Sequence, residues 1–339
     1  MDREYVGIDF HRRRSVVVHL DGDGERVSLT RIDNTPAALA ASVADAGDAP
    51  EVVLEATYGW YWAADLLAEC GASVHLANPR ALNWGERRVK NDIADATDLA
   101  HMLRLGRLPE AWIAPPDVRE LRELVRYRAK LVQLRSGLKA QVHAVMAKHG
   151  VLPSVVDMFG PAGQRQLDEL QLGHGYTVRV ESLRDLIEVY DREIVMIERE
   201  IHRRLRDDRG YLAVQAINGV GRTIAAIIVA EIGDVTRFPS PRHLCSWAGL
   251  TPGRHESDRK GHDTGITKQG SKLLRWALIE GISRYHAGPY FAGEFHRIAD
   301  RRGRNKARVA IARRVLTLAY YGLRDGEIRC LTQPPVEAA

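Results

Sequence analysis

The order of β-rich and helical segments in the first hundred residues constrains the fold most. Three β-rich runs come first, within residues 4–32, and short polar turns separate them. A helix follows, with Thr35 as its expected N-cap. Two further strands, at residues 51–57 and 72–79, each lead into a helix. Three strands, helix, strand, helix, strand and helix is an α/β order.

This order is that of the RNase H-like fold, in which the first three strands form an antiparallel meander. We therefore predict an RNase H-like α/β domain over residues 1–114. Pro109, Pro115 and Pro116 interrupt the pattern and indicate a linker at its end.

Two long helical segments are expected next, at residues 119–149 and 178–205, within a region that spans 115–206. Apolar residues recur in both at spacings of three and four. The residues that mark them are Leu121, Leu124, Leu131, Leu134 and Leu138, then Leu183, Leu186, Ile187, Tyr190, Ile194 and Ile197. This spacing fits an antiparallel hairpin or coiled coil that serves as a spacer or dimerisation arm, and two helices of an ordinary bundle fit nearly as well.

Residues 207–328 are expected to form a mainly α-helical C-terminal domain, followed by a tail over 329–339. The domain contains a glycine hairpin between helices, a basic glycine-rich loop that leads into a helix, and a last helix with a basic face near residues 306–321. No apolar run approaches the roughly 20 residues that span a bilayer, so no membrane partner is expected. The three cysteines are scattered, which fits a reducing cytoplasm.

The charge is unevenly distributed. The net charge is +5, but residues 1–60 hold 6 Lys/Arg against 11 Asp/Glu, and residues 251–314 hold 15 against 6. An acidic head and a basic tail indicate two roles on one polyanion, metal binding in front and phosphate binding behind. Ordinary surface variation is the alternative.

Four acids in the first domain are candidate ligands. Asp9 lies inside an apolar strand, where an unpaired carboxylate is costly, and Glu55 lies at the carboxyl end of another strand, where α/β sites form. Asp92 and Asp95 open the helix after the last strand. At about 100° per residue, Asp92 faces the sheet, Asp95 lies at the edge of that face, and Asp98 points to solvent.

Convergent carboxylates repel one another unless a cation lies between them. Hard oxygen ligands favour Mg²⁺ or Mn²⁺, and two such ions roughly 3.5–4 Å apart can hold a scissile phosphate. Each acid alone has an ordinary structural explanation, and it is their order and placement that predict a metal site.

The C-terminal region carries candidate nucleic-acid contacts. Gly219 and Gly221, followed by Arg222, lie before an expected helix. They resemble the hairpin of helix-hairpin-helix modules that hold a phosphate on backbone N–H groups; a tight turn without a ligand fits equally well. Ser271 is an expected N-cap, with Lys272 and Arg275 on the next turn.

Ser257 lies among basic residues, as a hydroxyl nucleophile in phosphoryl transfer requires, although a serine in a charged loop is usually only solvated. The basic residues of this segment are Arg254, Arg259, Lys260 and Lys268.

Together these segments resemble one family across nearly the whole chain, the insertion-sequence transposases of the IS one-ten family, also called bridge recombinases. The matching segments are GIDFHR, LEATYGWY, KNDIADATDLA, the block from INGVGRTIAA to SWAGLTP, and SDRKGHDTGITKQGSKLLRWAL. Two departures stand out. Asp258 follows the serine where the family usually has glycine, and Asn218 precedes Gly-Val-Gly where proline is common.

The resemblance implies a RuvC-like domain whose Asp9, Glu55, Asp92 and Asp95 bind Mg²⁺, and a C-terminal transposase domain whose Ser257 links covalently to DNA. It implies donor and target DNA as partners, a structured noncoding guide RNA, and assembly of dimers and tetramers through the helical arm. Two other functions stay open: a RuvC-type two-metal nuclease that does not use the serine, and a non-catalytic nucleic-acid-binding protein.

Overall fold

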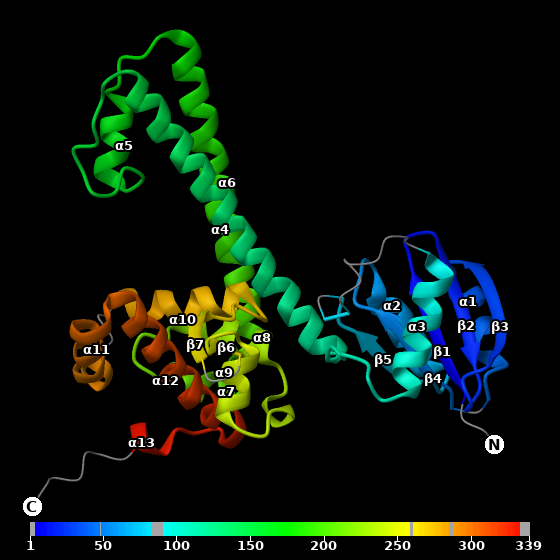
Figure 1. The fold of residues 1–339 in the computed structure, drawn as a ribbon. Coiled ribbons are helices and arrows are strands. Elements are labelled where there is room, and N and C mark those ends of the chain that lie inside the picture. Colours follow the sequence, from blue (N-terminus) through cyan, green and yellow to red (C-terminus); the bar gives the residue numbers. More distant parts are fainter. Residues whose placement is uncertain are drawn as a thin grey trace, which may run out of the picture. The chain divides into compact units, whose positions relative to one another are not determined.

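The computed structural model describes residues 4–47, 49–79, 81–82, 91–257, 260–284 and 288–332. The chain divides into two compact units, Met1–Ala114 and Pro115–Ala339. Figure 1 shows a sheet with helices in the first unit and an almost entirely helical second unit. No helix among the described residues combines the length and hydropathy that crossing a membrane requires.

The first unit is built on a five-stranded mixed sheet in the order β3-β2-β1-β4-β5. Strands β1 to β3 are antiparallel neighbours, and β4 and β5 continue the sheet parallel to β1. The strands are β1 (Tyr5–Phe10), β2 (Arg14–Leu20), β3 (Arg26–Asp33), β4 (Glu51–Glu55) and β5 (Ser73–Ala77). The predicted meander and the α/β order are confirmed.

Helices cover both faces of this sheet. They are α1 (Pro36–Ala44), α2 (Trp60–Glu69) and α3 (Asp92–Arg104). On one face, Ile8 and Leu54 are buried in the cluster that includes residues of α1 and α2. On the other face, Val53 is buried with Leu99 of α3. Thr35 caps α1 as predicted, because its Oγ1 accepts a hydrogen bond from the N–H of Ala38 at 3.2 Å.

Two long helices begin the second unit and run alongside each other (Figure 1). These are α4 (Pro116–Lys148) and α6 (His174–Leu205), joined through α5 (Pro161–Asp168). Arg128 of α4 binds Glu198 of α6 at 2.6 Å between Nη2 and Oε1. The predicted helical hairpin is present, but Leu134 and Leu186 are 40% and 45% exposed, so these two leucines lie outside its buried seam.

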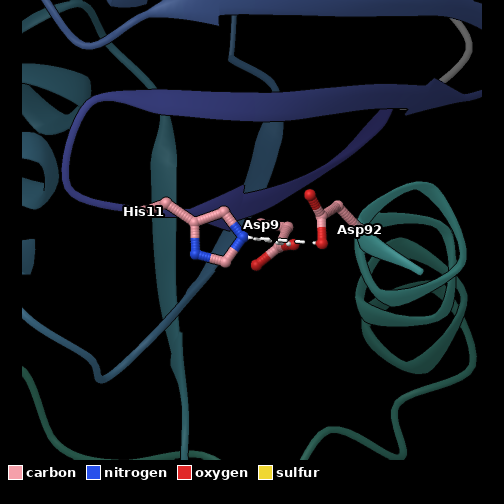
Figure 2. A group of neighbouring side chains, drawn as sticks. All are labelled: Asp9, His11 and Asp92. Carbon is pink, nitrogen blue, oxygen red and sulfur yellow. Dashed lines mark ion pairs between the residues drawn. The ribbon is translucent and has the colours of Figure 1, made fainter. Parts of the chain in front are cut away.

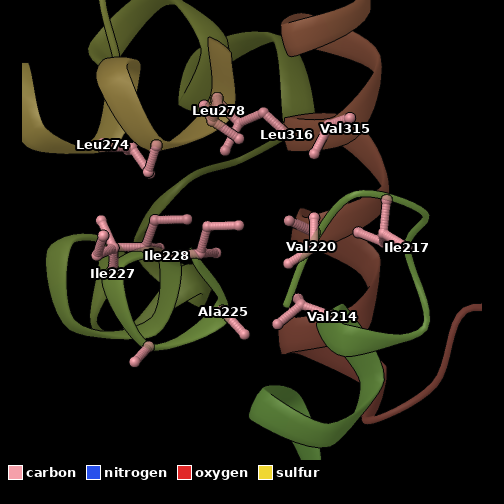
Figure 3. Packing of buried hydrophobic residues seen from close by; sticks show 14 of the residues in the cluster. Val214, Ile217, Val220, Ala225, Ile227, Ile228, Leu274, Leu278, Val315 and Leu316 are labelled. Carbon is pink, nitrogen blue, oxygen red and sulfur yellow. The ribbon is translucent and has the colours of Figure 1, made fainter. Parts of the chain in front are cut away.

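The remaining helices of the second unit surround one hydrophobic core. They are α7 (Arg209–Gln215), α8 (Arg222–Ile232), the 3₁₀ turn η2 (Val235–Arg237), α9 (Pro241–Trp247), α10 (Lys272–Arg284), α11 (Gly288–Arg302), α12 (Arg304–Asp325) and α13 (Arg329–Thr332). Figure 3 shows residues of the α7–α8 hairpin, α10 and α12 pointing into this core.

A β-hairpin replaces the loop that we predicted between α9 and α10. It pairs β6 (Pro252–Ser257) with β7 (Lys260–Ile266) in an antiparallel two-stranded sheet. The prediction failed because these residues lack the alternation of apolar and polar side chains that marks a half-buried strand. Ser257 ends β6, where its backbone pairs with that of Lys260.

Two arginines of α4 hold the carboxyl end of α8. Arg122 donates to the carbonyl oxygens of Ala230 and Glu231 at 2.7 and 3.0 Å, where the last carbonyls of a helix need donors. Arg126 donates from Nε and Nη2 to the two carboxylate oxygens of Glu231 at 2.8 and 2.9 Å. The Glu231 side chain is 3% exposed and that of Arg126 is 50% exposed, so a buried acid is satisfied by a cation at the surface.

Replacing Glu231 by alanine is expected to lower the free energy of unfolding by about 2 kcal/mol, because two charge-assisted hydrogen bonds are lost from a buried site. The matched control is Glu198→Ala, whose carboxylate is 39% exposed and is expected to contribute less than about 1 kcal/mol. Urea unfolding followed by circular dichroism measures both. Equal losses in the two variants would contradict this account of the α4–α8 contact.

Candidate metal centre

Asp9 lies near the carboxyl end of the central strand β1 and is 5% exposed. Ile8 pairs with Leu54 of the parallel strand β4, so Asp9 and Glu55 follow side by side at the same edge of the sheet. Because side chains alternate along a strand and Leu54 belongs to the cluster with α1 and α2, Glu55 points to the opposite face, that of α3. The fold thus brings these two acids to one edge beneath one helix.

Gly7 allows α3 to lie directly on β1. A Cβ atom at Gly7 would lie 2.0 Å from the carbonyl oxygen of Ala96 and 2.9 Å from the backbone nitrogen of Ala100. Both contacts are to the backbone of α3, so no side chain can turn away to make room. The missing side chain at Gly7 therefore determines how closely the first turn of α3 approaches the end of β1.

His11, Asp9 and Asp92 meet where β1 ends and α3 begins (Figure 2). Nε2 of His11 lies 3.1 Å from Oδ2 of Asp9 and 3.7 Å from Oδ1 of Asp92. Among the described residues this is the one group of three metal-ligating side chains whose atoms all lie within 4.8 Å of one another. The side chains of His11 and Asp92 are 43% and 52% exposed, so the group opens to solvent above the buried Asp9.

Hydrogen bonds fix the turns that carry these residues. Asn34 donates from Nδ2 to the carbonyl oxygen of His11, and its Oδ1 accepts from Oγ of Ser15 at 2.7 Å. Thr57, just after β4, donates from Oγ1 to the carbonyl oxygen of Phe10 at 3.2 Å. The backbone on either side of His11 is therefore held by residues distant in sequence.

The first turn of α3 separates its three aspartates. Asn91 caps the helix, with Oδ1 accepting from the N–H of Ile93 at 3.1 Å. Asp92 lies on the same helix face as the buried Ala96 and Leu99, as the helical angle predicts, but its side chain is 52% exposed. Asp95 is 4% exposed and so is more deeply buried than Asp92, although it was expected at the edge of the face.

Asp98 differs from the prediction. It is half-buried rather than turned fully to solvent. The reason is that chain segments before and after α3 flank that side of the helix. Leu82 from the segment before it lines a pocket together with Asp98 and His101.

The donor atoms of the group fit a divalent cation. Carboxylate oxygens from Asp9 and Asp92 are ligands that Mg²⁺ and Mn²⁺ accept, and the helix N-terminus at Asp92 favours negative charge there. The imidazole of His11 adds a nitrogen donor, which suits transition metals better than Mg²⁺. The sequence pattern does not identify His11 as a ligand, because His11 opens the polar turn HRRR, which is typical of a solvated connection. Its only sequence signal was its position two residues after Asp9.

The glycine hairpin before α8 is shaped by packing. Gly219 has φ +87°, and a Cβ atom there would lie 2.6 Å from the carbonyl oxygen of Gly281 in α10. Gly221 is the N-cap of α8 with nothing within 4 Å of its added Cβ, so the helix N-terminus at Arg222 is open on that side. Gly219 thus serves a close backbone contact, whereas Gly221 leaves room for a ligand.

The segment before α10 is held against the chain that follows α9. Gly249 and Gly270, both at positive φ, approach the backbones of Gln269 and Trp247 so closely that added Cβ atoms would lie 2.3 and 2.4 Å away. Arg275 donates from Nη1 to the carbonyl oxygen of Ala248 at 3.0 Å and also to that of Gln269. The structure therefore places Arg275, a candidate phosphate contact, on backbone carbonyls of its own unit.

The other basic candidates are distributed around α10. Lys268 lies in the same segment with φ +56°, and its N–H donates to the carbonyl oxygen of Gly249 at 3.1 Å. Lys272 is exposed at the start of α10, where Ser271 acts as the predicted cap and accepts from the N–H of Leu274 at 3.1 Å. Arg259 lies outside the described residues, as do the side chains of Arg254, Ser257 and Lys260.

Comparison with known proteins assigns this combination of units. A family model described as a DEDD transposase matches residues 6–150, which include all four candidate acids. A second model, described as the transposase IS116/IS110/IS902 family, matches residues 212–296, which include Ser257.

Individual relatives agree with these models. A Sinorhizobium fredii sequence named as transposase y4qE is 32% identical over 202 residues, which are 60% of this chain and 50% of that protein. The transposase for insertion sequence element IS1111A of Coxiella burnetii is 26% identical over 278 residues, 77% of this chain and 74% of the relative. A pilin gene-inverting protein of Moraxella bovis is 34% identical over 113 residues, 32% of this chain and 35% of the relative.

An α/β unit with acids gathered at the end of its central strand is followed by a helical unit with a basic hairpin. This combination matches family models of insertion-sequence transposases. The chain belongs to the IS116/IS110/IS902 family. It spans only about half the length of the Sinorhizobium fredii relative.

Proposed function

We propose that the chain is a DNA transposase that cuts DNA strands at the ends of an insertion sequence and joins them to new partners. The observation that carries the proposal is the group formed by Asp9, His11 and Asp92, which lies within the segment matched as a DEDD transposase. The relative named for pilin gene inversion supports rejoining as well as cutting.

In this proposal Asp9, Glu55, Asp92 and Asp95 hold Mg²⁺ or Mn²⁺ in an RNase H-like domain. The strand order β3-β2-β1-β4-β5 supports this fold assignment. A bound ion would stabilise the charge that develops on the scissile phosphate. Asp9 supplies a carboxylate fixed by burial, and Gly7 keeps Asp92 within reach of it by letting α3 lie against β1.

Ser257 is the proposed nucleophile. Its Oγ gives up its proton and attacks the phosphorus, so that an O–P bond forms to the protein and the P–O bond of the DNA strand breaks. The released DNA oxygen takes up a proton and becomes a hydroxyl. Attack by the hydroxyl of another strand reverses these steps and restores the serine. The family resemblance supports this role, and Arg254, Arg259 and Lys260 would balance the charge on phosphorus.

The proposed partners are donor and target DNA, a structured guide RNA and further copies of the chain. The proposed phosphate contacts are Gly221, Arg222 and Lys272.

Three exposed apolar side chains on one face of α6 support assembly through the arm. They are Val178, Val189 and Met196, which are 51%, 42% and 54% exposed and lie within about 20° of one another around the helix. Action on DNA places the protein in the cytoplasm in this proposal.

A second function is a RuvC-type two-metal endonuclease that hydrolyses branched DNA. The observation that favours it is that all four acids lie in the first unit, so the metal site needs no residue near Ser257. The two functions differ in whether the protein becomes covalently joined to the DNA.

Removal of divalent metal tests the shared part of both functions. Strand cutting of supercoiled DNA that carries the ends of the encoding insertion sequence is expected to fall by at least about 100-fold in EDTA. Mg²⁺ or Mn²⁺ added back should restore it, and Ca²⁺, which is larger and less demanding in geometry, serves as the matched control. Cutting that persists in EDTA would contradict a metal-dependent site at Asp9.

A further inference from the structure

A groove separates the arm helix α4 from the first turns of α10. Its volume is about 710 Å³, within the roughly 300–1,000 Å³ range of pockets that hold small organic ligands. The described residues that line it are Arg126, Arg128, Ala129, Lys130, Val132, Gln133 and Ser136 of α4, and Lys272, Leu273 and Trp276 of α10. The groove lies wholly within the second unit.

Trp276 is the unusual member of this set. It is 49% exposed, although a large aromatic side chain in a packed unit is normally mostly buried. It follows Lys272 by four residues, so the indole and the ammonium group lie on one face of α10. A flat apolar surface and a positive charge therefore point to the same side of the groove.

The α4 side of the groove, like the α10 side, combines apolar and positively charged side chains. Ala129 and Val132 supply a small apolar floor, and Lys130 adds an exposed ammonium group at its edge. Arg126 and Arg128 already bind Glu231 and Glu198, so their guanidinium groups hold fixed positions. None of the described lining residues is acidic.

We propose that this groove binds single-stranded nucleic acid, with one base stacked on the indole of Trp276 and neighbouring phosphates on Lys130 and Lys272. An aromatic platform bordered by cations is how proteins hold single strands without reading their sequence. A single strand is required because the bases of a duplex are already stacked on one another. The proposal rests on nucleic acid as partner, as the proposed function does, but it needs neither metal nor strand cutting.

Fluorescence anisotropy with labelled oligonucleotides of about 20 nucleotides tests the site on the full chain in EDTA. Trp276→Ala is expected to weaken binding of the single strand about tenfold, the typical loss for one stacked base, and Trp276→Phe should keep most of the affinity. Lys272→Ala should lower the dependence of affinity on salt by the equivalent of about one phosphate contact.

Tyr127→Ala is the matched control, because Tyr127 is a 46% exposed aromatic residue of α4 that is not among the groove residues. The affinity of Tyr127→Ala for the single strand should stay within about twofold of wild type. In Trp276→Ala, duplex binding should change less than single-strand binding. The same measurement on an RNA and a DNA oligonucleotide shows which of the two the groove binds.

Unchanged binding of both single strands by Trp276→Ala, or an equal loss for duplex, would overturn the proposal. A chain that lacks strand transfer but loses single-strand affinity in Trp276→Ala would remove the proposed function and leave the groove assignment intact.

Discussion

Asp9→Asn is expected to reduce strand cutting by at least about 100-fold while the chain stays folded. Asparagine has nearly the same size and can replace Asp9 in its buried position, but it removes the charge that the cation requires. Changes to residues that only support metal ligands already cost about 10–100-fold in affinity or activity, so loss of a ligand should cost at least as much. Mn²⁺ binding followed by electron paramagnetic resonance, measured beside the cutting assay, reports the metal directly.

Asp98→Asn is the control for Asp9→Asn, because Asp98 lies on the same helix as Asp92 but outside the group with His11. It should retain Mn²⁺ binding and cutting within about twofold of wild type, the range expected for a residue with no role in the site. If Asp9→Asn binds Mn²⁺ as tightly as wild type, the metal lies elsewhere and the assignment of this site is wrong.

Gly7→Ala is expected to lower the free energy of unfolding of the first unit by about 3 kcal/mol or more, at the upper end of the usual cost of overpacking. The new methyl group would overlap the backbone of α3 at Ala96, so the helix must move away from β1. Mn²⁺ affinity should fall as well, because the same movement separates Asp92 from Asp9. Thermal unfolding and Mn²⁺ titration measure the two effects.

Gly22→Ala provides the comparison for Gly7→Ala within the same unit. A Cβ atom at Gly22 meets nothing within 4 Å, and its backbone is not in the left-handed region. This variant should change stability by less than about 0.5 kcal/mol, as surface substitutions usually do. If Gly7→Ala were equally harmless, the contact between β1 and α3 would not set the geometry of the site.

Local sequence signals predicted the elements well where one residue type determines the backbone. Thr35 predicted the start of α1, which begins at Pro36. Pro115 precedes α4, which begins at Pro116, the last of the three prolines assigned to the linker. Helical spacing predicted α4 and α6 but also assigned Leu134 and Leu186 to the seam, where they do not lie. A spacing of three or four residues does not show whether an apolar residue of a two-helix arm faces the other helix or lies on the exposed surface next to that contact.

The candidate site was predictable where geometry along one element suffices. The angle around α3 predicted that Asp92, and not Asp98, approaches Asp9, and Asp92 is the one that lies in the group with His11. It did not predict that Asp95 would be more buried than Asp92, because that depends on where the sheet edge ends beneath the helix. His11 could not be identified from spacing, because its role depends on a turn held by Asn34 from a different part of the chain.

The basic segment shows the same limit more strongly. Arg275 looked like a phosphate contact, but its guanidinium group binds backbone carbonyls that a tertiary contact brings near. Trp276 was hidden in an ordinary helical pattern, and only its exposure beside α4 marks it. Residues whose partners lie in another segment are the ones that sequence patterns miss.

Transfer of DNA strands through Ser257, with the help of the acids near Asp9, is the step on which the proposed function depends. It is tested most directly by stopping a cutting reaction with detergent, digesting the protein, and identifying by mass spectrometry any peptide that carries a nucleotide. The account predicts a nucleotide on Ser257, present in wild type and absent in both Ser257→Ala and Asp9→Asn. Cut DNA with no protein attached, or a nucleotide on another residue, would contradict it.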